Sequence, residues 1–157
     1  MTDFGGLPTA AIIAAVESVL QETGLFDQVN GHEPISAPGG ELTAAVWPQE
    51  VDPAAEDSGL DGTAAVFLLY VRLYYPARSE PLDMVEVTLS NGVDAVMNAL
   101  IGGFTLGGLT RNIDIFGKSG NTKLRAQYGF VPMDAAWYRC ATITVPCVVN
   151  DPWEEVE

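Results

Sequence analysis

The chain has 157 residues, of which 48% are apolar, so we expect one domain over residues 1–157 with a packed core rather than a disordered chain. Its formal net charge at pH 7 is −14, and no Lys or Arg precedes Arg72, whereas eleven acids do, from Asp3 to Asp61. Because tight nucleic-acid binding requires clustered cations, this distribution argues against specific nucleic-acid binding and leaves two interpretations, a self-repelling acidic protein or a chain whose acidic face docks on a basic face of another copy.

The first predicted element is a helix in residues 7–24. Pro8 suits a first helical position, Gly24 suits the residue just past the end, and the apolar stripe consists of Ile12, Val16, Val19 and Leu20.

Three strands are predicted next, at residues 25–29, 41–49 and 63–77, and an acidic loop at residues 50–62 separates the last two. The third strand alternates between an apolar face and a mixed aromatic face. The apolar face carries Phe67, Leu69, Val71 and Leu73, and the mixed face carries Leu68, Tyr70, Arg72 and Tyr74. Such a mixed face has a composition that is enriched where proteins contact one another.

A second helix is predicted in residues 79–103, with Leu82, Val85, Leu89, Val93, Val96 and Leu100 on one face. A half-buried strand at 109–117, a protruding loop or hairpin at 118–130 and a last long strand from Ala136 follow. This order predicts an α+β fold, in which two α-helices pack on one face of a mixed, mostly antiparallel β-sheet.

The last stretch, Ala136 to Trp153, holds both cysteines. Cys140 and Cys147 are seven residues apart, so on one strand they face opposite sides and cannot bridge each other. Pro146 lacks a backbone donor, which predicts a sheet edge, a bulge or a change of strand partner. We expect the residues after Pro146 to leave the main pairing and to pack elsewhere, for instance on another subunit.

No catalytic, cofactor-binding or metal-binding residues emerge from the sequence. The single histidine, His32, lies far from both cysteines, and the acids of residues 50–61 do not follow a calcium-loop spacing. The Gly117-Lys118-Ser119 stretch lacks the first glycine of a phosphate-binding loop, because position 112 is Asn112. We therefore expect no cofactor, no metal and no enzymatic activity. The sequence shows no signal peptide and no apolar run long enough for a membrane span, which predicts a soluble protein without a membrane partner.

Four features together resemble the tail terminator proteins of long-tailed (siphovirus-type) bacteriophages of actinobacterial hosts. They are the Ala-rich opening helix that leads to "TGLFDQVNGHEP", the segment "LTAAVWPQEVDPAAEDSGLDGTAAVFLLYVRLYYP", the second helix that ends in "GGFTLGG" before "RNIDIFG", and the closing "YRCATITVPCVVND". The features span nearly the whole chain.

This resemblance implies a small subunit that forms a ring, typically a homohexamer, on the last ring of the tail tube. The ring would stop tube polymerisation and join the tail to the head-side connector, with the major tail tube protein and the connector as partners. DNA would pass through the lumen, and acidic walls would let it slide. The implied location is the virion, at the head–tail junction, after assembly in the host cytoplasm.

From the charge pattern and this resemblance we expect two interaction surfaces. The subunit or ring interface would include Tyr70, Arg72, Tyr74, Arg111, Lys118, Lys123, Arg125, Arg139, Pro146 and Trp153. An acidic loop facing the lumen or a neighbouring ring would include Glu50, Asp52, Glu56, Asp57 and Asp61. The alternatives are another head–tail joining component, such as a tail-completion or connector protein, and an acidic cellular module that binds a small ligand.

Overall fold

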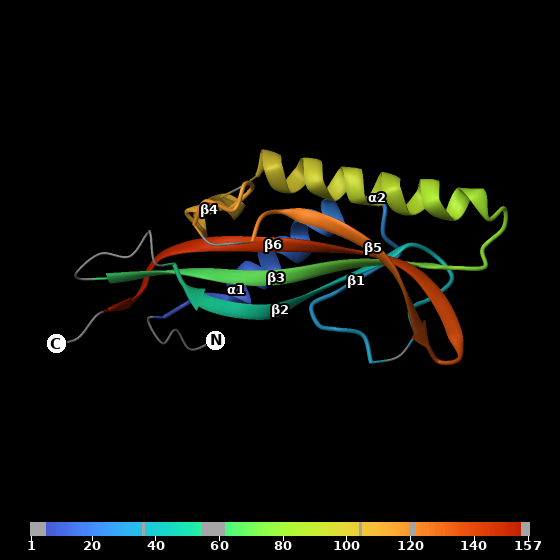
Figure 1. The fold of residues 1–157 in the computed structure, drawn as a ribbon, viewed down its shortest axis with the longest axis horizontal. Helices are drawn as coiled ribbons and strands as arrows, with labels where there is room; N and C mark the ends of the chain where they lie inside the picture. Colours follow the sequence, from blue (N-terminus) through green and yellow to red (C-terminus); the bar gives the residue numbers. More distant parts are fainter. Residues whose placement is uncertain (1–5, 36, 55–61, 104, 120–121, 155–157) are drawn as a thin grey trace.

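Two helices and a curved sheet make up the fold, seen here in a computed structural model that describes residues 6–35, 37–54, 62–103, 105–119 and 122–154 (Figure 1). The elements in chain order are α1 (Thr9–Glu22), β1 (Gln28–Asn30), β2 (Thr43–Pro53), β3 (Gly62–Pro76), α2 (Asp83–Gly102), the 3-10 turn η2 (Leu106–Gly108), β4 (Asn112–Ile113), β5 (Arg125–Met133) and β6 (Ala136–Glu154). The α+β class predicted from the sequence is confirmed.

The sheet has six strands in the order β1-β2-β3-β6-β4, and β5 also pairs with β6. β1 runs parallel to β2, and the other pairs are antiparallel. The β3–β6 pair is the longest, with register partners from Pro76↔Tyr138 to Gly62↔Glu154. The predicted mixed, mostly antiparallel sheet is therefore present.

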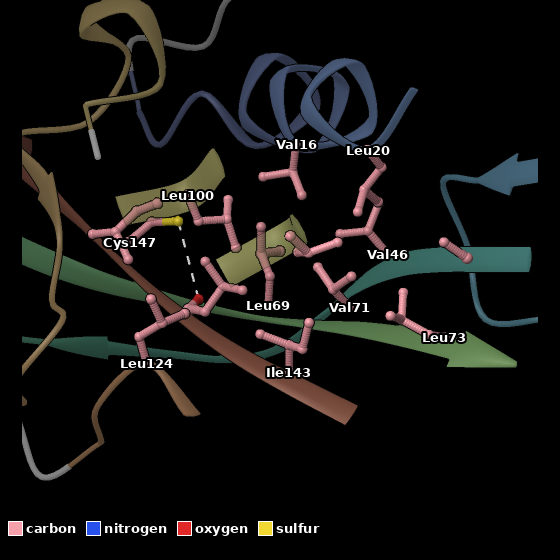
Figure 2. Close-up of a cluster of buried hydrophobic side chains, with 14 of the residues drawn as sticks. Val16, Leu20, Val46, Leu69, Val71, Leu73, Leu100, Leu124, Ile143 and Cys147 are labelled. Carbon is pink, nitrogen blue, oxygen red and sulfur yellow. Dashed lines mark hydrogen bonds between the residues drawn. The ribbon is translucent and has the colours of Figure 1, made fainter. Parts of the chain in front are cut away.

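Both helices pack on the same face of the sheet, as predicted. On β3 that face carries Phe67, Leu69, Val71 and Leu73, which all belong to one buried cluster with helix residues such as Val16 and Leu100. Figure 2 shows Leu69, Val71 and Leu73 in this cluster with Val16 and Leu100. A large apolar side chain contributes about 1.5–3 kcal/mol when it is fully buried. This cluster is the main core.

The opposite face holds a second, smaller cluster of Ala45, Trp47, Tyr74, Tyr138 and Cys140. The segment before β2 covers part of it, because the Tyr138 hydroxyl donates to the Pro38 carbonyl at 2.6 Å. The Ala37 amide also donates to Asp134 Oδ2 at 2.7 Å, at the tip of the β5–β6 hairpin. Two hydrogen bonds thus fasten this segment across the second face.

The residues after Pro146 do not leave the sheet, so that expectation is wrong. Cys147, Val148 and Val149 continue the β3 pairing and are buried. Pro146 instead marks the predicted change of partner, since β6 pairs with β5 up to Thr144 and with β4 from Cys147 onward. The Pro146 carbonyl accepts from the Asp114 amide at 2.8 Å, so its nitrogen also faces the β4–β5 side and no hydrogen bond to β3 is lost.

Several other boundaries differ from the sequence predictions. The strand expected at 25–29 is β1, Gln28–Asn30, and the loop or hairpin expected at 118–130 contains the start of β5. The strand expected at 109–117 has only two residues, because both Asp114 carboxylate oxygens accept from backbone amides, of Lys118 and Ser119, each at 2.8 Å, and turn the chain. β2 extends to Pro53, into the predicted acidic loop. Leu82, predicted on the apolar face of the second helix, precedes α2 and is 62% exposed.

The β5–β6 turn offers a test of backbone strain. Asp134 and Ala135 connect the paired residues Met133 and Ala136, and both have positive φ, +49° and +63°. A left-handed conformation costs an L-residue about 1–2 kcal/mol, and two-residue hairpin turns of this kind prefer glycine second. Glycine removes this strain, but it also increases the conformational entropy of the unfolded chain, which offsets part of the gain. We therefore expect Ala135→Gly to raise the free energy of unfolding by about 0.5–1 kcal/mol in urea denaturation.

The matched control is Ala136→Gly, at the first position of β6, where no positive φ favours glycine. This change should lower the stability, and an equal loss from both variants would contradict the strain argument.

Candidate subunit interface

Arg72 lies on the sheet face opposite the helices, within an aromatic cluster. Its guanidinium carbon is 5.3 Å from the centre of the Trp47 ring, and its Nε donates to Thr142 Oγ1 at 2.8 Å. Tyr70 meets the same Trp47 ring edge-on, with 6.2 Å between ring centres. Arg72 and Tyr70 are half-buried, so they combine a fixed geometry with access to a partner.

Tyr74, on the same face, is only 2% exposed and belongs to the second cluster. Burial raises the pKa of its hydroxyl, and the positive charge of Arg72 opposes that rise. Its predicted interface role stays a prediction.

Arg139 connects α2 to the β5–β6 hairpin. Its Nε and Nη2 donate to the two Glu86 carboxylate oxygens at 2.9 and 3.3 Å, and its Nη1 donates to the Gly129 carbonyl at 3.1 Å. The guanidinium also lies over the rings of Phe130 and Tyr128, at 4.6 and 5.5 Å from their centres. An ion pair with an exposed carboxylate contributes only about 0–1 kcal/mol, so this arginine mainly orients the hairpin.

Sequence reasoning missed the aromatic side chains around Arg139. Tyr128, Phe130 and Trp137 are 44, 61 and 54% exposed. Tyr128 and Phe130 are two residues apart on β5 and therefore share a face, and the Tyr128 hydroxyl lies 3.1 Å from Ser90 Oγ of α2. The alternation of residues 125–133 carries this signal, but residues 118–130 were predicted as a protruding loop or hairpin.

The remaining predicted interface cations gather around β4 and the start of β5. Lys118 and Lys123 are exposed in the connection between these strands, and Arg125 is the first residue of β5. Arg111 hydrogen-bonds to Ser119 Oγ at 3.2 Å and to Asn112 Oδ1 at 3.2 Å. Among the described residues, no carboxylate lies within ion-pair distance of the side chains of Lys118, Lys123 or Arg125.

Pro146 and Trp153, the other predicted interface residues, are both part of β6. Pro146 is buried within the sheet, and Trp153 is half-buried opposite Thr63 of β3. Their interface role remains a prediction.

The predicted acidic surface is described only in part, because Glu56, Asp57 and Asp61 lie outside the described residues. Glu50 and Asp52 are exposed on β2. A hydrogen bond with the Asp52 side chain and the negative charge of that residue raise the pKa of Glu50. The two carboxyl groups therefore repel each other at neutral pH. A cation of a partner would reduce this repulsion on binding.

The cysteines and the histidine do not form a reactive pair in the structure. Cys140 and Cys147 are free and buried in different clusters, and burial raises the pKa of both thiols, to about 12 for Cys147. His32 is exposed, with its Nδ1 3.1 Å from the Glu33 carbonyl oxygen. Within the described ranges, no three His, Cys, Asp or Glu side chains gather as metal ligands would. Within the described ranges, the helices lack the length and the apolar composition of a membrane span.

Comparison with known proteins gives a likeness at the level of the fold. No protein-family model and no curated protein sequence matches the chain. Among solved structures, a chain from the virion of a native gene transfer agent particle has the same fold, with a TM-score of 0.55 and 19% sequence identity, over 94% of this chain and 97% of that one. At this identity, the match shows that the two chains share a fold along almost their full length.

The paired carboxyl groups on β2 lead to a pH-dependent prediction. The raised pKa of Glu50 means that the folded state binds this proton more tightly than the unfolded state does, so its contribution to stability is present at low pH and lost as pH rises through the folded pKa. Glu50→Gln should therefore raise the free energy of unfolding at pH 7 but have almost no effect near pH 3, measured by urea denaturation.

Asp52→Asn should reproduce this gain, and the double variant should gain less than the sum of the two, since both remove one repulsion. A loss of stability in Glu50→Gln at pH 7 would contradict the argument.

Thiol reactivity tests the burial of the cysteines. With a pKa of about 12, Cys147 should hold on the order of a thousandfold less thiolate than a free cysteine of pKa about 8.5, and it is also shielded. We expect both thiols to resist a disulfide reagent in the folded protein and to react at once in denaturant. Single replacements, Cys140→Ala and Cys147→Ala, separate the two signals.

An added exposed thiol, Gln127→Cys, is the positive control. Reaction of Cys147 at the rate of this added thiol would show that the core is open.

Proposed function

We propose that this chain is a structural protein of a phage-like virion and that it forms the ring that ends the tail tube. The observation that carries the proposal is the shared fold with a chain of a gene transfer agent virion, which extends over 94% of this chain. The resemblance of four sequence segments to tail terminator proteins points to the more specific role.

The charge distribution supports a self-assembling ring. The chain before Arg72 contains acidic residues but no Lys or Arg, and exposed cations occur together at Lys118, Lys123 and Arg125. An acidic patch on one copy and a basic patch on the next form a head-to-tail contact, which gives a ring when its rotation closes. The partners in this proposal are further copies of the chain, as a homohexamer, the major tail tube protein below and the head-side connector above.

The same charge suits a channel for DNA. A ring of subunits that each carry a net charge of −14 repels phosphates, so DNA would slide without being held. In this proposal, Glu50 and Asp52 face the lumen or a neighbouring ring. The proposal requires no catalytic step.

A tail-completion or connector protein is the second candidate, because the shared virion fold supports it equally. The two candidates predict different particles. Loss of a tail terminator leaves tube growth unchecked, whereas loss of a connector leaves tails of normal length that are not joined to heads.

Electron microscopy of particles assembled without this chain tests the proposed role. We expect tails that exceed the normal length and lack heads, and normal length should return when the wild-type chain is supplied in trans. Normal-length tails that are joined to heads would contradict the role, and normal-length tails without heads would favour the connector candidate.

A further inference from the structure

The two edges of the sheet differ in their exposed charges. Strand β1 lies at one edge, and β4 and β5 lie at the other. The chain from α1 to the start of β2 holds no cation and has carboxylates at Glu17, Glu22, Asp27, Glu33 and Glu41. The exposed cations Lys118, Lys123 and Arg125 belong to the opposite edge. Copies placed edge to edge in one direction would therefore attract each other.

A groove lies at the acidic edge, between the end of α1, the start of β2 and the middle of α2. It encloses about 700 Å³. Its apolar lining includes Leu25, which is 45% exposed, and Phe26, and its acidic lining consists of Asp27 and Glu41, which are both exposed. A partner that fits this groove would bring an apolar group and a cation.

The opposite edge presents these two groups together. Phe116 is 77% exposed, and the exposed Lys118 follows two residues later. The turn between them has a fixed conformation. The buried Asp114, which is 4% exposed, accepts hydrogen bonds from the amides of Lys118 and Ser119. Gly117 provides the positive φ, +75°, that the turn requires. A turn fixed in this way loses little conformational freedom on docking.

We propose that Phe116 and Lys118 of one copy dock in the groove of the next copy, with Phe116 against Leu25 and Phe26 and Lys118 facing Asp27 and Glu41. The inference rests on the proposed ring, since it specifies how neighbouring subunits join. The two surfaces are different and lie at opposite sheet edges, so the contact is head-to-tail and leaves one free surface of each kind on every open assembly. A buried aromatic anchor beside a charge pair is the arrangement that dominates many interfaces.

Disulfide trapping tests this contact directly, because the native cysteines are both buried. The double variant Phe116→Cys/Leu25→Cys should form covalent dimers, trimers and larger multimers under mild oxidation, seen on non-reducing gels and reversed by reductant. The matched control is Phe116→Cys/Leu82→Cys, which places the second thiol at another exposed leucine, 62% accessible, outside the groove. The control should give no multimers beyond dimers.

Charge exchange provides an independent measurement. Lys118→Glu should weaken self-association at least tenfold in native mass spectrometry, and adding Asp27→Lys and Glu41→Lys should restore it. Arg78→Glu, another exposed cation, should leave association unchanged.

The two proposals fail in different ways. If the chain assembles with itself or on tail tubes but gives no trapped multimers and no charge-exchange effect, the groove contact is wrong and the ring stands. If the wild-type chain remains monomeric at every concentration and also on tails, the contact and the ring are both overturned.

Discussion

The antiparallel pairing of β3 with β6 is the interaction on which the rest of the structure depends. β6 pairs with β3 along almost its whole length, and its other edge serves β5 and then β4. Alternation along these two strands sends Phe67 and Ile143 to the helix side and Tyr74 and Cys140 to the other side. One pair of strands therefore creates both clusters. Pro146 is tolerated in β6 because its nitrogen faces away from β3, at the point where the other neighbour of β6 changes from β5 to β4.

The helices and connections complete these two faces in different ways. On the main core, α1 and α2 provide apolar stripes, and Arg139 joins α2 to the hairpin through Glu86. On the other face, a segment before β2 is held by hydrogen bonds at Pro38 and Ala37. The half-buried Arg72 lies there over the ring of Trp47, which Tyr70 meets edge-on. The groove, the basic turn and this aromatic cluster thus lie on separate surfaces, which suits a subunit with several neighbours.

Much of the fold could be predicted, because its main elements have strong local periodicity. The 3.6-residue period of α2 and the alternation of β3 each identified the buried face, with Leu82 as the exception at a helix end. The short β4 could not be predicted, since it depends on Asp114 accepting two backbone hydrogen bonds that compete with strand pairing. The candidate interface was predicted only as a set of residue types. Tyr74 turned out to be buried, and Arg139 is bound to Glu86.

The sequence by itself determined the α+β class, the two faces of β3, the separation of the cysteines and the uneven charge, because each of these follows from composition or from short-range spacing. Only the tertiary structure decided what lies next to what. Strand partners are chosen across the chain, so the continuation of β6 beyond Pro146 was not readable from its own residues. The same reason applies to the charges, since the strand order β1-β2-β3-β6-β4 is what separates the acidic groove from Phe116 and Lys118.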